Sequence, residues 1–371
     1  MEKIKGNKLI GFSYLRVLCV FLIVFGHMFG QTIAAQWHLS DGIATFLLLN
    51  ILGDGVRFAI NCFIMISAWF LIDKSFSGAR FVNAWLMTFI INVVITVAMI
   101  IAGKASFMSV FSLQAFLPII GRPQWYMCEY LILLLIFPYL NLVIRNISRR
   151  QHRAIIYTGL ILIVAIETCL IIPISFTVPL FSEFIWFVFV YFIIAYLKIY
   201  EDCMWNRLSK ISLIVVLVMA YGLIVALFVI SDVNGSNSII YMANHFKTDY
   251  AALLGFVCSL CLFQIAVKIN NADSKKSSLI ELLARNSGYI YIIHSVPVLW
   301  RSDLFNFWNE FFFINKWYEK DLLLIGMIVA TIGVSLIGAF VGETCTNIVI
   351  PKMMRFRLIQ TIIIKLDQVY E

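Results

Sequence analysis

The sequence predicts an all-α fold, a polytopic bundle of about ten membrane-spanning helices with both termini in the cytoplasm. Of the 371 residues, 62% are hydrophobic and only 13% are charged, which leaves too little polar surface for a soluble domain. The apolar residues form runs of about twenty, long enough for a helix to cross a hydrocarbon layer about 30 Å thick. A β-barrel would need short segments of alternating polarity instead.

The apolar runs place ten spans along the chain. They cover residues 9–30, 56–73, 81–102, 125–144, 154–173, 182–199, 211–231, 250–267, 287–305 and 321–345. A further apolar segment, Ile43–Leu52, would extend only about 15 Å as a helix and ends at a Gly-Asp-Gly sequence. We expect this segment to be interfacial or re-entrant, since counting it as a span would invert every later helix.

The positions of Lys and Arg test this count independently of hydropathy. Cytoplasmic loops of membrane proteins are enriched in these two residues. Of the 28 Lys and Arg residues, 20 lie in one set of alternating loops or at the span ends beside them and 6 in or beside the other set, while Arg16 and Arg57 are counted within spans. The set of 20 includes both terminal segments, which predicts cytoplasmic termini. The net charge of +8 is thereby explained by orientation, and no nucleic-acid partner is expected.

The loops are short, so residues 1–350 are predicted to form a single integral membrane domain. Residues 351–371 mix Lys and Arg with Leu and Ile, a pattern typical of a basic amphipathic helix on the cytoplasmic membrane surface. Most of the eight cysteines lie in apolar runs and are interpreted as small core residues. Cys258 and Cys261 lack a second pair of ligands, so no metal site is predicted.

Arg16 and His27 are the most informative polar residues of the predicted spans. An ionisable side chain in a span costs about 2.5–3.5 kcal/mol on insertion scales and therefore marks a candidate site. Eleven residues of α-helix rotate about 20° beyond three full turns, so both side chains lie on one helix face, about 16 Å apart along the axis. The structural alternatives are an arginine that extends to the inner headgroups and a histidine that hydrogen-bonds a neighbouring helix.

The first span resembles a known family at these two residues. The stretch from Tyr14-Leu15-Arg16 to Phe25-Gly26-His27 is similar to the opening motif of the integral membrane acyltransferase type 3 family, with an Arg and a His separated by ten residues. Asn61 to Leu71 resembles the family's second-helix signature and includes Ser67. It departs at Ala68, where the family usually has Gly, and at Asn61, where many members have an acidic Asp.

The resemblance continues along the chain and covers roughly residues 9–345. Trp125-Tyr126 resembles the family's Trp-Tyr entry to a helix, and Tyr289 to His294 resembles its late Tyr-x-x-x-His helix. Asn61, Ser67, Trp125, Tyr126, Glu129 and His294 are therefore candidate residues of a substrate or donor cavity. His294 and Glu129 also have structural interpretations, namely a hydrogen bond within the bundle for His294 and an ion pair with Arg57 for Glu129. Glu167 and Glu343 are left unassigned.

The resemblance implies a multi-pass protein of the bacterial cytoplasmic membrane that transfers an acyl group, commonly acetyl from cytoplasmic acetyl-CoA. The acceptor would be a hydroxyl of an extracytoplasmic or lipid-linked surface glycan, and the partners would be these two substrates and membrane lipids. Acetyl-CoA would act as a co-substrate, with no permanently bound cofactor.

Histidine has a reference pKa of about 6.5, so His27 suits a general base or, alternatively, a transient acyl carrier. Arg16 suits binding of the coenzyme phosphates or of the reacting carbonyl.

Two other classes of membrane protein are compatible with intramembrane charges. A transporter or flippase of a lipid-linked oligosaccharide would line a path with such residues, but these proteins often contain internal repeats and the sequence shows none. A glycan polymerase typically carries a large external loop, which the short loops do not provide. The acyltransferase interpretation therefore ranks first, and the sequence does not identify the acceptor.

Overall fold

The computed structural model describes residues 10–30, 43–106, 117–169, 183–234, 251–269, 277–300 and 320–370, together with the isolated positions 108, 115 and 246. These residues form helices and their connections, and no strand occurs among them. The prediction of an all-α fold is therefore confirmed for the described part of the chain.

The helices follow one another as the apolar runs predict, with π-helical turns (η1, η4 and η8) inside three of them. In chain order they are α1 Ile10–Phe25, η1 Gly26–Gly30, α2 Ile43–Leu71, α3 Gly78–Ile101, α5 Trp125–Asn146, α6 Arg149–Gly159, η4 Leu160–Ala165, α7 Ile166–Cys169, α8 Glu183–Ile199, α9 Met204–Arg207, α10 Lys210–Asn234, α12 Leu253–Ile269, α13 Ser278–Arg285, α14 Ser287–His294, α15 Pro297–Trp300, α17 Lys320–Thr344, η8 Cys345–Val349, α18 Ile350–Met353 and α19 Arg357–Tyr370.

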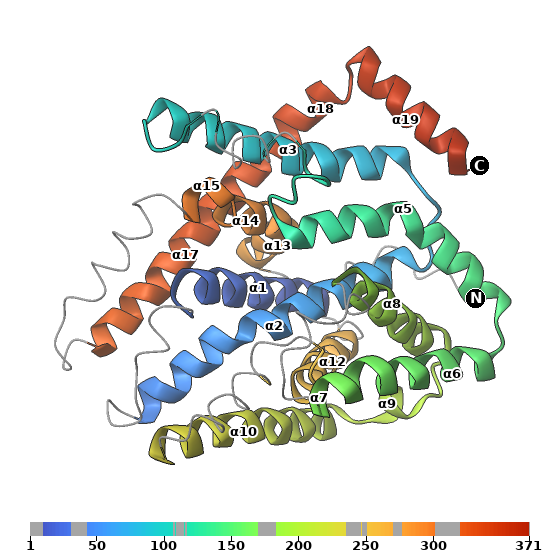
Figure 1. Ribbon diagram of the computed structural model, residues 1–371, viewed down its shortest axis with the longest axis vertical. Coiled ribbons are helices and arrows are strands. Elements are labelled where there is room, and N and C mark those ends of the chain that lie inside the picture. The colour runs from blue at the N-terminus through green and yellow to red at the C-terminus, as the bar shows by residue number, and fades with distance from the viewer. Residues whose placement is uncertain are drawn as a thin grey trace.

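Helices α1 and α2 lie across the middle of the molecule, with α3 and α5 on one side and α10 on the other (Figure 1). The first two helices pack along each other, and both contact α12. Phe12 of α1 is 1% exposed and forms an aromatic cluster with Trp69 of α2 and Phe263 of α12, at centroid distances of 5.9 and 5.4 Å. The central position of α1 places both Arg16 and His27 inside the bundle.

Five helical stretches of the described residues are long and apolar enough to cross a membrane. They are Ile10–Met28, Gly78–Ile101, Trp125–Asn146, Lys210–Asn234 and Leu324–Met353. Each coincides with a predicted span, and two shorter apolar helices, Arg57–Leu71 and Leu253–Ile269, coincide with two more. The chain is therefore a helical membrane protein, while the total of ten spans stays a prediction.

The expectation that Ile43–Leu52 is a separate interfacial or re-entrant element is wrong. The segment is the first part of α2, which continues without interruption to Leu71 over 29 residues. The helix passes through Gly53 and Gly55, residues that membrane helices contain more often than soluble ones do. Because the segment and the following span form one helix, they count as a single crossing, as the predicted topology requires.

The predicted span 287–305 is broken rather than continuous. Its described part consists of α14, which has 8 residues, and α15, which has 4. A break at Asn286 separates α14 from the preceding helix, α13. The break before Pro297 is a consequence of its ring, which prevents a continued backbone hydrogen bond. Ser295 lies at this break, and its hydroxyl donates to the carbonyl of Tyr291 at 2.6 Å. Residues 301–319 lie outside the described part of the chain.

Polar side chains join neighbouring helices inside the bundle. Asn92 of α3 and Gln124, the residue before α5, exchange two amide hydrogen bonds of 2.9 Å each, and both side chains are buried. The hydroxyl of Tyr191 in α8 donates to Asn141 of α5 at 2.7 Å. Such bonds satisfy polar groups that have no access to water in the hydrocarbon layer.

The predicted amphipathic helix of the C-terminal segment is present as α19, and it packs against the bundle rather than only on a membrane surface. It lies along α3 in Figure 1. Asp367 accepts a 2.7 Å hydrogen bond from the backbone nitrogen of Gly78, the first residue of α3. Tyr370 stacks on Phe76 at a centroid distance of 3.7 Å and donates to the carbonyl of Leu135.

Helix α17 packs closely on α14 because two glycines lie at the contact. A Cβ atom on Gly342 would come within 2.8 Å of the Cβ of Tyr289, and one on Gly338 would come within 3.0 Å of the Cα of Ile290. The spacing of four residues puts both glycines on one face of α17, the arrangement that lets membrane helices approach closely. This contact holds α14, and with it His294, against α17.

The substitution Gly342→Val should therefore destabilise the protein by about 1–3 kcal/mol, because the new side chain forces α14 and α17 apart. Thermal denaturation of the detergent-solubilised protein, followed by size-exclusion chromatography, measures this effect. Gly333→Val is the matched control in the same helix, since a Cβ at Gly333 has no atom within 4 Å. Equal melting temperatures for the two variants would contradict the close packing.

Candidate functional site

His27 and His294 form a pair that joins the first predicted span to the broken helix. His27 lies in the π-helical turn Gly26–Gly30 at the end of α1, and His294 is the last residue of α14. The Nδ1 atom of His27 lies 3.0 Å from the Nε2 atom of His294, and the two ring centroids are 5.2 Å apart. Two candidate residues separated by 267 positions are thus in direct contact.

The hydrogen bonds of the pair define which nitrogen carries each proton. The Nδ1 atom of His294 lies 2.8 Å from the carbonyl oxygen of Ile290, and a carbonyl only accepts, so this nitrogen is protonated. In a neutral His294 the lone pair is then on Nε2, which accepts from the Nδ1–H of His27. A neutral His27 consequently carries its lone pair on Nε2.

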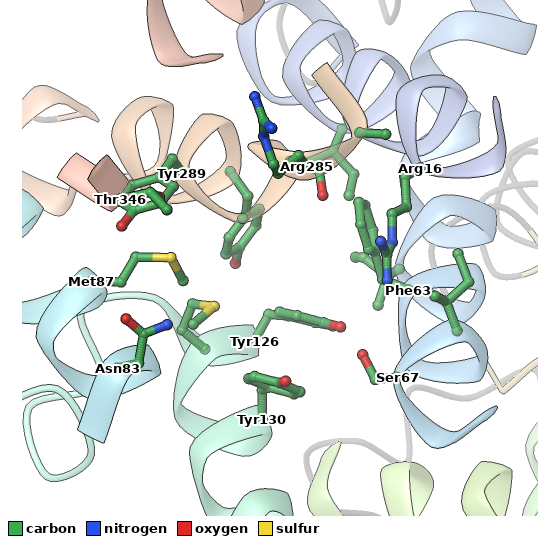
Figure 2. Close-up of a pocket in the computed structure, with 18 residues that line it drawn as sticks. Arg16, Phe63, Ser67, Asn83, Met87, Tyr126, Tyr130, Arg285, Tyr289 and Thr346 are labelled. Carbon is green, nitrogen blue, oxygen red and sulfur yellow. The ribbon is translucent and has the colours of Figure 1, made fainter. Parts of the chain in front are cut away.

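A cavity of about 360 Å³ lies between α1, α2, α3, α5, α13 and α14 (Figure 2). Three of the sequence-predicted residues line it, namely Arg16, Ser67 and Tyr126. Figure 2 shows the Arg16 side chain pointing toward the space between Ser67 and Tyr126. The structure therefore brings together candidates from the first, second and fourth predicted spans.

Arg16 is held in the cavity by aromatic neighbours, and the described residues around it include no acidic partner. Its guanidinium carbon lies 5.4 Å from the centre of the Phe70 ring, a cation–π distance. The hydroxyl groups of Tyr126 and Tyr130, one turn apart on α5, interact with its charge. Ser67 lines the same cavity as Tyr126. A cation that no described carboxylate binds is available to an anionic or carbonyl oxygen of a ligand.

Exposed residues also line the cavity. One of them is the cation Arg285, which was not among the residues predicted from the sequence. The exposed lining residues include Asn83, Arg285 and Thr346. In Figure 2 the Arg285 guanidinium is turned away from the cavity centre, and it forms a 2.7 Å ion pair with Glu343. Glu343, unassigned from sequence, also accepts from Asn286 at 3.0 Å.

The cavity ends close to the histidine pair without including it. Neither histidine is among the lining residues, but Ile23, one helical turn before His27, lines the cavity. Tyr291 also lines it, and the Tyr291 ring lies 5.8 Å from the ring of His294 and 5.6 Å from that of Tyr126. Tyr291 therefore connects the wall of the cavity to the histidine pair.

Asn61 and Trp125 have structural partners instead of positions in the cavity. Asn61 is fully buried and accepts a 2.8 Å hydrogen bond from the indole nitrogen of Trp186, which joins α2 to α8. Trp125 contacts Tyr126, with ring centroids 6.1 Å apart, but does not line the cavity.

The proposed pairing of Glu129 with Arg57 is wrong. Glu129 forms a 2.7 Å ion pair with Arg122. Arg122 precedes α5, and its side chain reaches Glu129 in the first turns of that helix. The prediction paired Glu129 with an arginine inside a span and overlooked this local partner.

The described residues contain no group of three or more His, Cys, Asp or Glu side chains able to hold a metal ion. A family model described as an acyltransferase domain matches residues 9–343, nearly the whole chain. The matched range includes the histidine pair, Arg16 and Arg285, and it ends before η8, α18 and α19. No curated protein and no solved structure matches the chain.

The Arg122–Glu129 pair should contribute to stability because the Glu129 side chain is only 6% exposed while that of Arg122 is 47% exposed. Arg122→Gln leaves a buried carboxylate without its cation and should cost about 1–3 kcal/mol, toward the lower end because water reaches the arginine. The double variant Arg122→Gln/Glu129→Gln removes the uncompensated charge and should recover part of the loss. Thermal unfolding of the three proteins measures both effects, and a double variant no more stable than Arg122→Gln would refute the pairing.

Proposed function

Because the chain belongs to the integral membrane acyltransferase type 3 family, we propose that it transfers an acetyl group from cytoplasmic acetyl-CoA to a hydroxyl of an extracytoplasmic or lipid-linked bacterial surface glycan. The observation that carries this proposal is the cavity that runs from exposed Arg285 past Arg16 to the level of the histidine pair. It provides a route for a thioester from one side of the membrane toward a base in the other half.

We propose a topology of ten spans in the bacterial inner membrane, with both termini in the cytoplasm. The asymmetry of Lys and Arg supports it, and so does the single continuous α2, which preserves the count of crossings. In this orientation the exposed end of the cavity, at Arg285 and Asn83, faces the cytoplasm. His27 then lies in the outer half of the membrane, where a glycan approaches.

The donor would bind with its thioester arm in the cavity. A volume of about 360 Å³ is at the small end of ligand sites and suits the narrow pantetheine arm better than the whole coenzyme. The nucleotide phosphates would stay at the mouth beside Arg285, while Arg16 offers a forked donor to carbonyl oxygens along the arm. Tyr126 and Ser67 line the same wall and provide hydroxyl groups.

The acceptor hydroxyl would be deprotonated by Nε2 of His27. As the proton moves to this nitrogen, the hydroxyl oxygen attacks the thioester carbonyl carbon, forming a C–O bond. The carbonyl re-forms as the C–S bond breaks, and the coenzyme thiolate leaves and takes up the proton from His27. A positioned base typically accelerates such a step by about 10²–10⁴-fold.

His294 would act as a positioning residue for this base. Its Nε2 accepts the Nδ1–H of His27, while its own Nδ1–H is fixed by the carbonyl of Ile290. This chain holds His27 in the tautomer whose Nε2 is the base, the role that a buried carboxylate performs in a catalytic triad. It also lets a positive charge on His27 be shared with a neutral acceptor as the proton arrives.

His27→Ala should lower acetyl transfer by about 100-fold or more, because the base is lost while the cavity remains. Transfer of labelled acetyl from acetyl-CoA to glycan in membrane vesicles measures the activity, at expression levels matched by chromatography. His152→Gln is the control, since His152 is a buried histidine that bonds the carbonyl of Phe192 in another part of the bundle. Full activity of a correctly folded His27→Ala protein would overturn the assignment of the base.

His294→Phe should lower transfer by about 10- to 100-fold, the loss expected from one hydrogen bond to a group that becomes charged. His294→Gln should recover part of this activity, because its amide oxygen can accept the Nδ1–H of His27. The ratio of the two variants, measured in the same vesicle assay, separates tautomer control from packing. If the two substitutions are equally damaging, His294 has only a packing role.

A further inference from the structure

A second cavity, of about 470 Å³, lies between α6, α8, α9 and α12 and shares no lining residue with the first. These helices lie on the opposite side of α1 and α2 from α3 and α5 (Figure 1). The proposed acetyl transfer gives this second cavity no role.

The walls of the second cavity are apolar along most of their length. Ile156 of α6 and Leu160 of η4 line it together with Ile193 of α8 and with Phe256 and Val257 of α12. Its edges are open to the outside of the bundle, because three further lining residues are exposed: Tyr157 by 60%, Met204 by 73% and Leu253 by 45%. An open apolar groove on the outer face of a membrane bundle is in contact with lipid chains.

One end of this groove carries positive charge. Arg149 and Arg153, one turn apart on α6, line it together with Asp202. Arg149 forms a 2.8 Å ion pair with Asp202 and lies 4.9 Å above the Tyr200 ring, and its guanidinium holds the pKa of the Asp202 carboxyl below its usual range. Arg153 is exposed and has no ion pair within the part of the chain that the structure describes. The polar end therefore has one excess positive charge.

The groove extends along α6 away from this charged end. Leu160 lies eleven residues after Arg149, about 16 Å along the helix. Farther along, the backbone nitrogen of Leu253 in α12 donates to the hydroxyl of Thr168 in α7 at 3.0 Å, so α12 flanks the same path. In the proposed topology the arginines lie at the cytoplasmic surface and the apolar part extends into the hydrocarbon layer.

We propose that this groove is a binding site for an anionic phospholipid, with one acyl chain between α6 and α12 and the phosphate on Arg153 and Arg149. The cationic end lies at the depth of the headgroups, and the cytoplasmic leaflet is rich in anionic lipids. Its volume lies within the range of small-molecule sites. The site is distinct from the histidine pair and does not depend on the proposed acetyl transfer.

Native mass spectrometry of the detergent-purified full chain tests the site, with phosphatidylglycerol and phosphatidylcholine of identical chains as probes. Phosphatidylglycerol should bind at least about tenfold more tightly, because only its headgroup has a net negative charge. Arg153→Gln should weaken phosphatidylglycerol binding by about tenfold. The matched control is Arg150→Gln, which removes an exposed arginine of the same helix that does not line the groove and should leave binding unchanged.

A second variant tests the apolar part of the groove. Val257→Trp fills it and should reduce binding of phosphatidylglycerol, provided that the variant elutes as wild type does. Equal binding of the two lipids, or an equal effect of Arg150→Gln and Arg153→Gln, would overturn the proposal in favour of a general surface charge effect. Binding of a polyprenyl phosphate at this site in place of phosphatidylglycerol would also overturn it and would assign the groove to an isoprenoid carrier.

Discussion

Water is not available to polar groups in the hydrocarbon layer, so each must find a partner inside the protein. This constraint organises most of the bundle. Asn92 binds Gln124, Asn61 binds Trp186, and His27 binds His294, and the last two bonds join helices that are distant in sequence. Arg16 differs from these residues, because its surroundings are aromatic rings and hydroxyl groups rather than a carboxylate. Of these four residues, the one without an amide, indole or imidazole partner among the described residues is therefore the one that lines the cavity.

The interrupted segment α13–α14–α15 brings His294 to His27 inside the bundle, which a continuous helix would not do. The interruptions at Asn286 and before Pro297 leave α14 as an 8-residue element, tied to α17 by close contact at two glycines. A short helix ends inside the protein, so its last residue, His294, is presented to the end of α1 rather than to a headgroup region. On the other side of α14, Arg285 stays at the cavity mouth because Glu343 holds it. One interrupted segment thus contributes to both ends of the site.

The sequence was sufficient for the positions of most described helices and for part of the site. Apolar runs located the spans, and an eleven-residue spacing indicated that Arg16 and His27 share a face. The contact of His27 with His294 was not predictable, because it depends on the π-helical turn and on packing across 267 residues. Arg285 was missed because the sequence places it in a basic loop, where Lys and Arg are read as indicators of orientation, whereas the structure has it as the last residue of α13. Glu129 was paired with the wrong arginine because only residues inside spans were considered as partners.

The length of α2 links the site to the surrounding bilayer. Its 29 residues extend about 43 Å, which exceeds a hydrocarbon layer of about 30 Å, so the helix must tilt, protrude or thicken the bilayer around it. Ser67 and Phe63, in the cavity wall, belong to this helix. Lipid chain length alters the preferred tilt of a helix that is longer than the bilayer is thick. Hydrophobic mismatch therefore acts on the helix that forms one wall of the cavity.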